Sequence, residues 1–154
     1  YPEFVARWVA VQQELSAPAV VEPERTARMK AFWLGEYFPW MVADRETGAA
    51  KVRAAFEPAR FSWAHAQYQM AESPSFDARS KLAAIAVPSL VIAGAADMAP
   101  PAKVKELADG LPDAEFVVFE HSGHFAPLEE PERFRKVVYH FLGVVDDGAG
   151  GAEG

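Results

Sequence analysis

The sequence predicts an α/β protein whose first half is helical and whose second half contains a short parallel sheet. Residues 87–93 and 115–120 are short apolar runs of the length typical of strands. A helical pattern follows each run, over residues 100–111 and from residue 131 onward. Because the order is strand, helix, strand, helix, we expect the two strands to pair in parallel.

The run over residues 87–93 contains Val91 and Ile92 and no charged side chain. This pattern favours a strand that is buried on both faces, as in parallel sheets. Gly94 permits a sharp turn after the strand, and Asp97 follows three residues later. Since α/β proteins place their chemistry at the carboxyl ends of such strands, Asp97 is a candidate site residue.

The part of the chain before the sheet is predicted to be helical and rich in aromatic residues. Apolar residues recur at helical spacing, and all four tryptophans precede a polar connector over residues 73–80. The expected helices cover residues 3–15, residues 23 to about 43 with an interruption at Pro39, residues 49–56 and residues 61–70. Residues 146–154 are glycine-rich and acidic, with nothing to bury, and we expect them to be disordered.

Composition restricts the class of protein. Of the 154 residues, 51% are hydrophobic and 24% are charged, which suits a globular domain with a core. The net charge of -7, without a Lys/Arg-rich cluster, argues against nucleic acid, and no apolar run approaches the roughly 18 residues of a membrane span. The lack of cysteine excludes disulfides and thiolate metal sites and agrees with a cytoplasmic location. The chain begins with Tyr1 rather than methionine, so we expect a fragment or a processed product.

His124 is the second candidate site residue, in the turn that follows the second strand. The carboxyl ends of neighbouring parallel strands meet at one edge of a sheet, so we expect Asp97 and His124 to meet there. In an acyl-transfer triad, a carboxylate accepts the Nδ1 proton of the histidine, which fixes the tautomer and stabilises the imidazolium. The pair therefore supplies two of the three parts of such a triad.

The residues that follow the connector form a series of short motifs. They are Leu82, Ile85-Ala86-Val87-Pro88, Leu90-Val91-Ile92-Ala93-Gly94, Asp97, Pro100, Ser122-Gly123-His124, Glu130-Pro131-Glu132, Phe134 and Phe141-Leu142. Through this series, the segment from Asp77 to Leu142 resembles the C-terminal part of the α/β-hydrolase superfamily. The resemblance implies that Asp97 is the acid and His124 the base of a catalytic triad.

The helical part resembles the cap domain that this family inserts ahead of its last strands. Its aromatic richness and the series from Phe32 to Pro39 are most similar to the proline-iminopeptidase-like branch. The resemblance implies a helical cap or lid over residues 1–76, the C-terminal part of the hydrolase core over residues 77–145, and a tail over residues 146–154. The expected fold is thus a partial α/β-hydrolase fold, in which the cap precedes the last two parallel strands.

One departure from the family pattern matters for function. The family nucleophile lies on a Gly-x-Ser-x-Gly turn upstream of the cap. None of the seven serines has these flanking glycines: Ser16, Ser62, Ser73, Ser75, Ser80, Ser89 and Ser122. We therefore expect the C-terminal part of a cofactor-free hydrolase for ester, amide or peptide-like bonds. By itself the chain should be inactive, because the nucleophile, serine or aspartate, and the oxyanion hole are missing.

The alternative is a truncated, non-catalytic module that binds a small apolar ligand or a protein partner. For the hydrolase, the expected partners are a small-molecule substrate and the missing N-terminal half. A second copy of the chain is a further candidate, because two strands alone leave a sheet edge exposed. We expect neither nucleic acid nor a membrane as a partner.

Several polar residues have plainer interpretations. Asp97 and His124 could simply stabilise the turns after their strands. Glu120, His121 and His124 form an incomplete ligand set, so we expect no metal ion. Four more residues are candidates for substrate contact, although exposed helix positions explain them as well: Glu36, Asp44, Glu46 and His65.

Overall fold

The computed structural model describes residues 2–72 and 76–144, which divide into two compact units. Within these residues, unit 1 comprises 2–40 and 45–78, and unit 2 comprises 41–44 and 79–144. The predicted disordered tail, residues 146–154, lies outside the described residues, as do residues 73–75 of the connector. Among the described residues, no helix combines the length and apolar character needed to cross a membrane.

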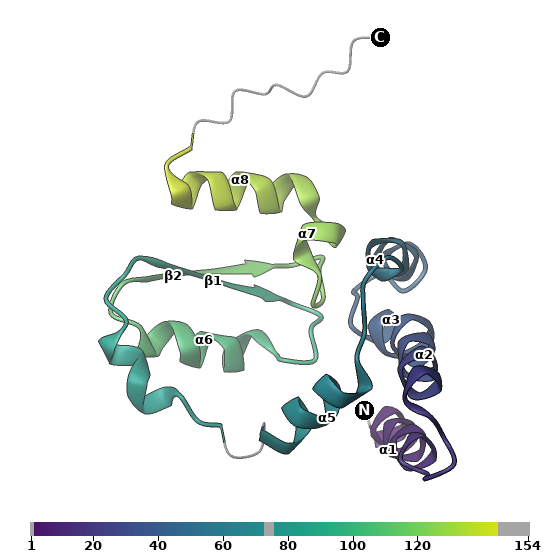
Figure 1. Cartoon of the computed structure of the whole chain (residues 1–154). Coiled ribbons are helices and arrows are strands. Elements are labelled where there is room, and N and C mark those ends of the chain that lie inside the picture. Colours follow the sequence, from purple (N-terminus) through teal and green to yellow (C-terminus); the bar gives the residue numbers. More distant parts are fainter. Residues whose placement is uncertain (1, 73–75, 145–154) are drawn as a thin grey trace. The chain divides into compact units, whose positions relative to one another are not determined.

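Unit 1 is helical, as the aromatic-rich pattern predicted. Its elements are α1 (Pro2–Leu15), α2 (Glu22–Phe32), the π-helical turn η1 (Trp33–Tyr37), α3 (Phe38–Trp40), α4 (Gly48–Phe56) and α5 (Trp63–Glu72), drawn in purple to teal in Figure 1. Pro23 lies in the first turn of α2, where a missing N–H costs nothing, and Lys30 in its last turn complements the helix dipole.

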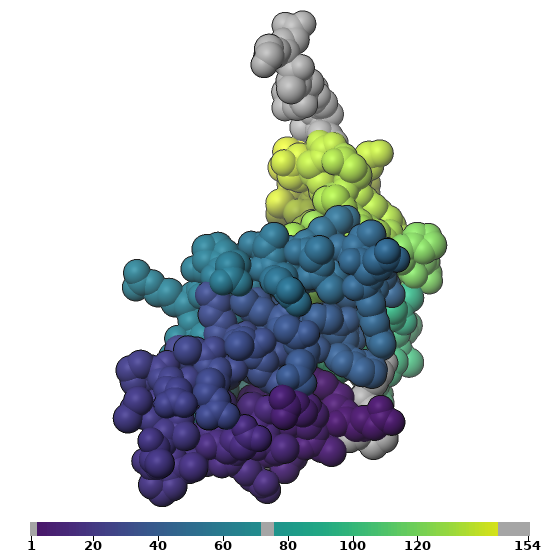
Figure 2. Space-filling view, turned by 90° about the vertical axis from the view of Figure 1, so that its right-hand side faces the viewer, coloured from purple at the N-terminus to yellow at the C-terminus, as the bar shows by residue number. Residues whose placement is uncertain are grey.

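The core of unit 1 is built where α1, α2 and α5 meet. Its buried residues are Val11, Leu15, Met29, Phe32 and Trp63. The ring of Trp8 stacks on that of Phe32 at a centroid distance of 5.1 Å. In Figure 2, α1 in purple lies against the blue helices of this unit. Many of the aromatic residues counted in the sequence thus pack inside unit 1.

The predicted interruption at Pro39 takes the form of a π-helical turn. The N–H of Phe38 donates to the carbonyl of Trp33, five residues earlier. A proline has no N–H to donate, and its ring clashes with the carbonyl four residues before it. The wider turn just ahead of Pro39 accommodates both defects, so the helical path continues to Trp40.

Unit 2 contains the predicted parallel sheet. Its elements are the 3₁₀ helix η3 (Arg79–Ala84), β1 (Ser89–Gly94), α6 (Pro101–Gly110), β2 (Ala114–Phe119), α7 (Ala126–Glu129) and α8 (Pro131–Leu142). In the described part of the chain the sheet has two strands, which pair in parallel from Ser89 opposite Ala114 to Gly94 opposite Phe119. In Figure 1, α6 lies on one side of these strands and α8 on the other.

Burial within the sheet is uneven. Val91 and Ala93 of β1 are buried, whereas Leu90 and Ile92 are only half-buried. Phe119 at the end of β2 is fully buried and packs against Phe134 of α8, with the ring centroids 6.1 Å apart. The sequence predicted burial on both faces of β1. The structure buries Val91 and Ala93 fully and Leu90 and Ile92 in part; since alternate side chains point to opposite faces, one face of β1 is covered more completely than the other.

Residues 41–44 differ from the sequence expectation. The helix expected to continue to about residue 43 ends at Trp40, and Met41–Asp44 packs with unit 2 instead. Met41 and Val42 are buried there. We call Met41–Asp44 the strap. It brings a segment from the first third of the chain into the unit that carries the candidate site residues.

Candidate active site

Asp97 and His124 lie in the loops that follow β1 and β2. Both strands point the same way, so the two loops leave the same end of the sheet (Figure 1). Backbone hydrogen bonds tie the loops together, because the N–H of Ala95 donates to Phe119 and that of Ala96 donates to Ser122, at 2.9 and 3.0 Å. The parallel pairing thereby brings together two residues that are 27 positions apart.

The two side chains are hydrogen bonded. Asp97 Oδ2 lies 2.9 Å from His124 Nδ1. A carboxylate can only accept, so the proton of this bond belongs to Nδ1, and the other ring nitrogen, Nε2, is left for a reacting group. Asp97 Oδ1 accepts the N–H of Ala99 at 3.2 Å, which holds the carboxylate in its turn. The Asp97 side chain is 11% exposed and that of His124 is 51% exposed, so the carboxylate is sheltered while the imidazole is accessible.

Three backbone segments approach one another closely beside the histidine. A Cβ placed on Gly94 would lie 2.6 Å from the carbonyl oxygen of Ser122 and nearer still to that of Gly123. A Cβ on Gly123 would lie 2.8 Å from the carbonyl carbon of Met41, in the strap. The N–H of His124 donates to the Met41 carbonyl at 2.6 Å. Glycine is therefore required at both positions for the loops and the strap to meet.

Glu130 fixes the start of the loop that carries His124, residues 120–125, which we call the histidine loop. Its Oε2 accepts the hydroxyl of the fully buried Ser122 at 2.7 Å and the N–H of His121 at 3.1 Å. Arg133 lies 3.4 Å from Oε1 and also donates to the carbonyl of Val118. Burial acts to raise the pKa of Glu130, but the hydrogen bonds from Ser122 and His121 and the pairing with Arg133 outweigh it and lower the pKa. This carboxylate is ionised and structural at neutral pH.

The other candidates from the sequence lie elsewhere or have other partners. His121 is an exposed loop residue, and His65 is exposed on α5. Glu36 accepts hydrogen bonds from Nε and Nη2 of Arg7, at 2.9 and 3.0 Å. Over residues 2–72 and 76–144, no group of three or more histidine or carboxylate side chains is placed to hold a metal ion.

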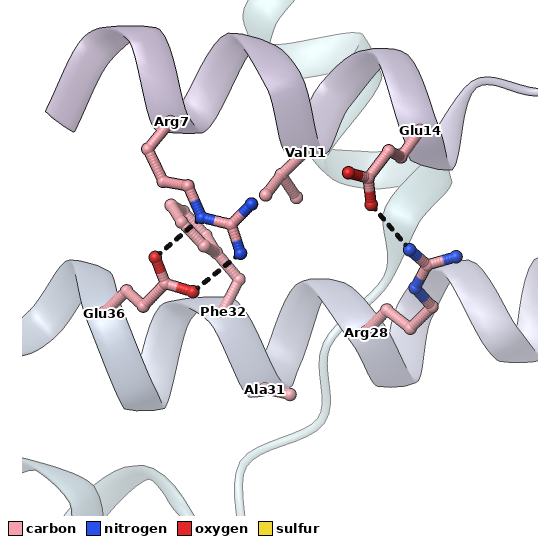
Figure 3. Close-up of a pocket in the computed structure, with 7 residues that line it drawn as sticks. All are labelled: Arg7, Val11, Glu14, Arg28, Ala31, Phe32 and Glu36. Atoms are coloured by element: carbon pink, nitrogen blue, oxygen red, sulfur yellow. Dashed lines mark hydrogen bonds and ion pairs between the residues drawn. The ribbon is translucent and has the colours of Figure 1, made fainter. Parts of the chain in front are cut away.

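A hollow in unit 1 lies between α1 and α2 (Figure 3). It has a volume of about 260 Å³ and is lined by Arg7, Val11, Glu14, Arg28, Ala31, Phe32 and Glu36. Its charged groups already pair across the two helices, since Arg7 binds Glu36 and Arg28 lies 2.8 Å from Glu14. The hydrogen bond to Glu36, followed by the charge of Glu36, raises the pKa of Arg7. A ligand here would have to displace these ion pairs, so the hollow is a weaker candidate than the Asp97–His124 pair.

Comparison with known proteins identifies the family. The sequence profile of the alpha/beta hydrolase family matches residues 2–137. A proline iminopeptidase of Levilactobacillus brevis is 35% identical over 72 residues, which are 47% of this chain and 24% of that protein. The AB hydrolase superfamily protein YisY of Bacillus subtilis is 42% identical over 66 residues, 42% of this chain and 25% of that protein.

Solved structures agree with the fold. An alpha/beta fold family hydrolase from Bacillus anthracis superposes with a TM-score of 0.65 at 24% identity, over 90% of this chain and 48% of that one. A thermophilic esterase from Thermogutta terrifontis gives a TM-score of 0.59 at 28% identity, over 77% of this chain and 48% of that one. The chain thus spans about half the length of these structures, and the matched regions are about a quarter of the curated relatives.

The chain belongs to the α/β-hydrolase family, because the family profile covers most of its residues. The fold prediction is confirmed: the structure is helical with a two-strand parallel sheet in its described part, a partial α/β-hydrolase fold. The predicted similarity to the proline-iminopeptidase-like branch is also confirmed, since a second proline iminopeptidase, from Heyndrickxia coagulans, is 37% identical over 68 residues.

Proposed function

We propose that Asp97 and His124 are the acid and the base of a hydrolase catalytic triad whose nucleophile is not among these 154 residues. The observation that carries the proposal is the 2.9 Å bond from His124 Nδ1 to Asp97 Oδ2 at the carboxyl ends of two parallel strands. In the neutral ring, a carboxylate at Nδ1 fixes the tautomer that carries its proton there, so Nε2 faces the nucleophile as an acceptor. The same carboxylate stabilises the imidazolium that then forms.

The proposed reaction is hydrolysis of an ester, amide or peptide-like bond. With a serine nucleophile, its oxygen attacks the carbonyl carbon as its proton passes to His124 Nε2, and His124 then protonates the leaving group. His124 next takes a proton from a water molecule that attacks the acyl-enzyme, which releases the acid and regenerates the nucleophile. A triad acid must be held in place while the base must reach the substrate. The sheltered Asp97 and the accessible His124 meet these two requirements.

The nucleophile is assigned to residues outside the sequence because no serine here has the Gly-x-Ser-x-Gly surroundings. The assay is turnover of p-nitrophenyl esters by the chain and by its His124→Ala variant. We expect equal rates, since His124 as a base has no nucleophile in this chain to deprotonate. Turnover that depends on His124 would show that this chain carries its own nucleophile.

Unit 1 is proposed to be the cap or lid of the enzyme, within the predicted span of residues 1–76. The support is its helical composition and a core of its own, centred on Leu15 and Phe32. Ligand pockets of enzymes are mostly apolar, and a cap rich in aromatic residues suits that role.

The β1 edge is proposed to pair with a further strand in the longer enzyme. In the described residues β1 has one partner strand, and an unpaired edge is a template for another chain. By itself the chain should therefore self-associate through β1. Sedimentation velocity over a range of concentrations measures this, and a monomer at every concentration would contradict the proposal.

A non-catalytic binding module is the second candidate, favoured by the lack of the nucleophile motif in this sequence. The two candidates differ in what should precede the cap. A hydrolase requires a Gly-x-Ser-x-Gly or an equivalent aspartate turn in the upstream coding region. In such a longer protein, Asp97→Asn should lower kcat by about 10⁴-fold without unfolding it, whereas a binding module should be indifferent to that change.

A further inference from the structure

Glu129 gathers three backbone N–H groups from two distant parts of unit 2. Its Oε1 accepts the N–H of Ala43, in the strap, at 2.6 Å. Its Oε2 accepts the N–H of Gly123 at 2.8 Å and that of Phe125 at 3.2 Å. Hydrogen bonds to an ionised carboxylate are stronger than those between neutral groups. One half-buried side chain therefore joins the strap to the histidine loop.

The two loop residues that Glu129 holds are the neighbours of His124 on either side. The N–H of His124 itself donates to Met41 in the strap, at 2.6 Å. Every backbone N–H from residue 123 to residue 125 is thus bound either by Glu129 or by the strap that Glu129 anchors. Glu130 has a different task, because it binds Ser122 and His121 ahead of this stretch.

We propose that Glu129 is a positioning residue for His124: it sets the backbone from which the imidazole reaches Asp97. The inference rests on the proposed function of the pair. A histidine ring is placed by its backbone, and the Nδ1–Oδ2 bond of 2.9 Å does not survive a displacement of about 1 Å. The sheltered Asp97 cannot follow the ring, because Ala99 holds its other oxygen.

The test is Glu129→Gln in the full chain, with the His124 ring observed by ¹H–¹⁵N NMR. Glutamine keeps one carbonyl oxygen but turns an NH₂ group toward a backbone N–H, so at least one of the three bonds is lost. We expect the Nδ1–H resonance of His124 to disappear into exchange with water. The amide protons of Ala43 and Phe125 should exchange at least about tenfold faster, while circular dichroism stays unchanged.

The matched control is Glu132→Gln, which removes the same charge three residues away. Glu132 is 77% exposed and pairs with Arg135 on the surface. This variant should keep the Nδ1–H resonance and the exchange rates of the wild type. A Glu129→Gln protein that loses amide protection but keeps the Nδ1–H resonance would overturn the inference, because Glu129 would then be structural alone.

Two further variants separate the possible failures. Asp97→Asn should abolish the Nδ1–H resonance whatever Glu129 does; if the resonance persists, the pair itself, and with it the proposed function, is refuted. Glu129→Asp keeps the charge but withdraws it by one methylene, and it should weaken the resonance less than glutamine does. Loss of the fold in both Glu129 variants, with Glu132→Gln unaffected, would overturn the positioning role.

Discussion

Gly94→Ala tests the close approach on which the site geometry depends. Gly94 ends β1, and the loop that carries His124 crosses directly over it. The added Cβ would lie 2.6 Å from the Ser122 carbonyl oxygen and still closer to that of Gly123, whereas real Cβ atoms stay beyond 3.0 Å. Both obstacles are backbone atoms, which cannot rotate away as a side chain can. The loop after β2 must therefore move off the strand.

The magnitude follows from what that movement breaks. Inserting a methyl group into a packed backbone contact costs about 1–3 kcal/mol. The bond from Ala96 N–H to Ser122 is 3.0 Å long and is lost when the loop shifts, for about 1 kcal/mol more. We expect the free energy of unfolding of unit 2 to fall by about 2–4 kcal/mol. Exchange of the Ala95 and Ala96 amide protons should then be roughly 30- to 1000-fold faster.

Gly110→Ala is the control within the same unit. Its Cβ would meet Leu82 Cδ1 at 2.6 Å, but that atom ends a flexible side chain and can turn aside. We expect a change below about 1 kcal/mol. Urea denaturation followed by circular dichroism, with amide exchange as the local measurement, compares the two variants. Equal effects at Gly94 and Gly110 would refute the argument that backbone contact with the histidine loop requires glycine.

Two other variants test the two units, one variant in each. Glu130→Gln should cost about 1–3 kcal/mol at neutral pH, because Ser122 and His121 lose a charged acceptor. The folded state lowers the pKa of Glu130, so the stability difference between wild type and variant should have its full size above the ordinary pKa of glutamate. The difference should vanish as the pH falls through the lowered pKa. A stability difference that grows in urea titrations toward pH of about 3 would contradict this prediction. Leu15→Ala, at a fully buried position of unit 1, should cost about 2–5 kcal/mol and leave amide exchange at Ala95 in unit 2 unchanged. Equal acceleration at Ala95 would show that the units unfold together.

Elements with a long local pattern were predictable from the sequence. The helix expected over residues 100–111 is α6, Pro101–Gly110, and the run over residues 87–93 is β1, Ser89–Gly94. The period of a helix and the length of a strand depend on residues within a few positions of one another, so both predictions need no knowledge of the rest of the chain. The turn after β1 was predicted from Gly94, and the approach of Asp97 to His124 was predicted from the parallel pairing of the strands.

The shortest helical elements were not predictable from the sequence. The four residues of α7 and the six of η3 are too few for a helical period to appear. Pro127 in the first turn of α7 is a start signal, but without a following pattern it does not distinguish a helix from a turn. The π-helical turn at Trp33–Tyr37 accommodates Pro39, which the sequence indicated only as an interruption of the helix.

By itself, the amino-acid sequence determined the order of the strands and helices and which aspartate and which histidine follow the strands. The tertiary structure alone decided how the histidine is held. Ala43 of the strap donates a hydrogen bond to Glu129, although the two residues are 86 positions apart in the sequence. No local sequence pattern predicts that bond. The physical reason is that strands and helices are selected by neighbours along the chain. A hydrogen bond between distant backbone segments exists only once both have been folded into place.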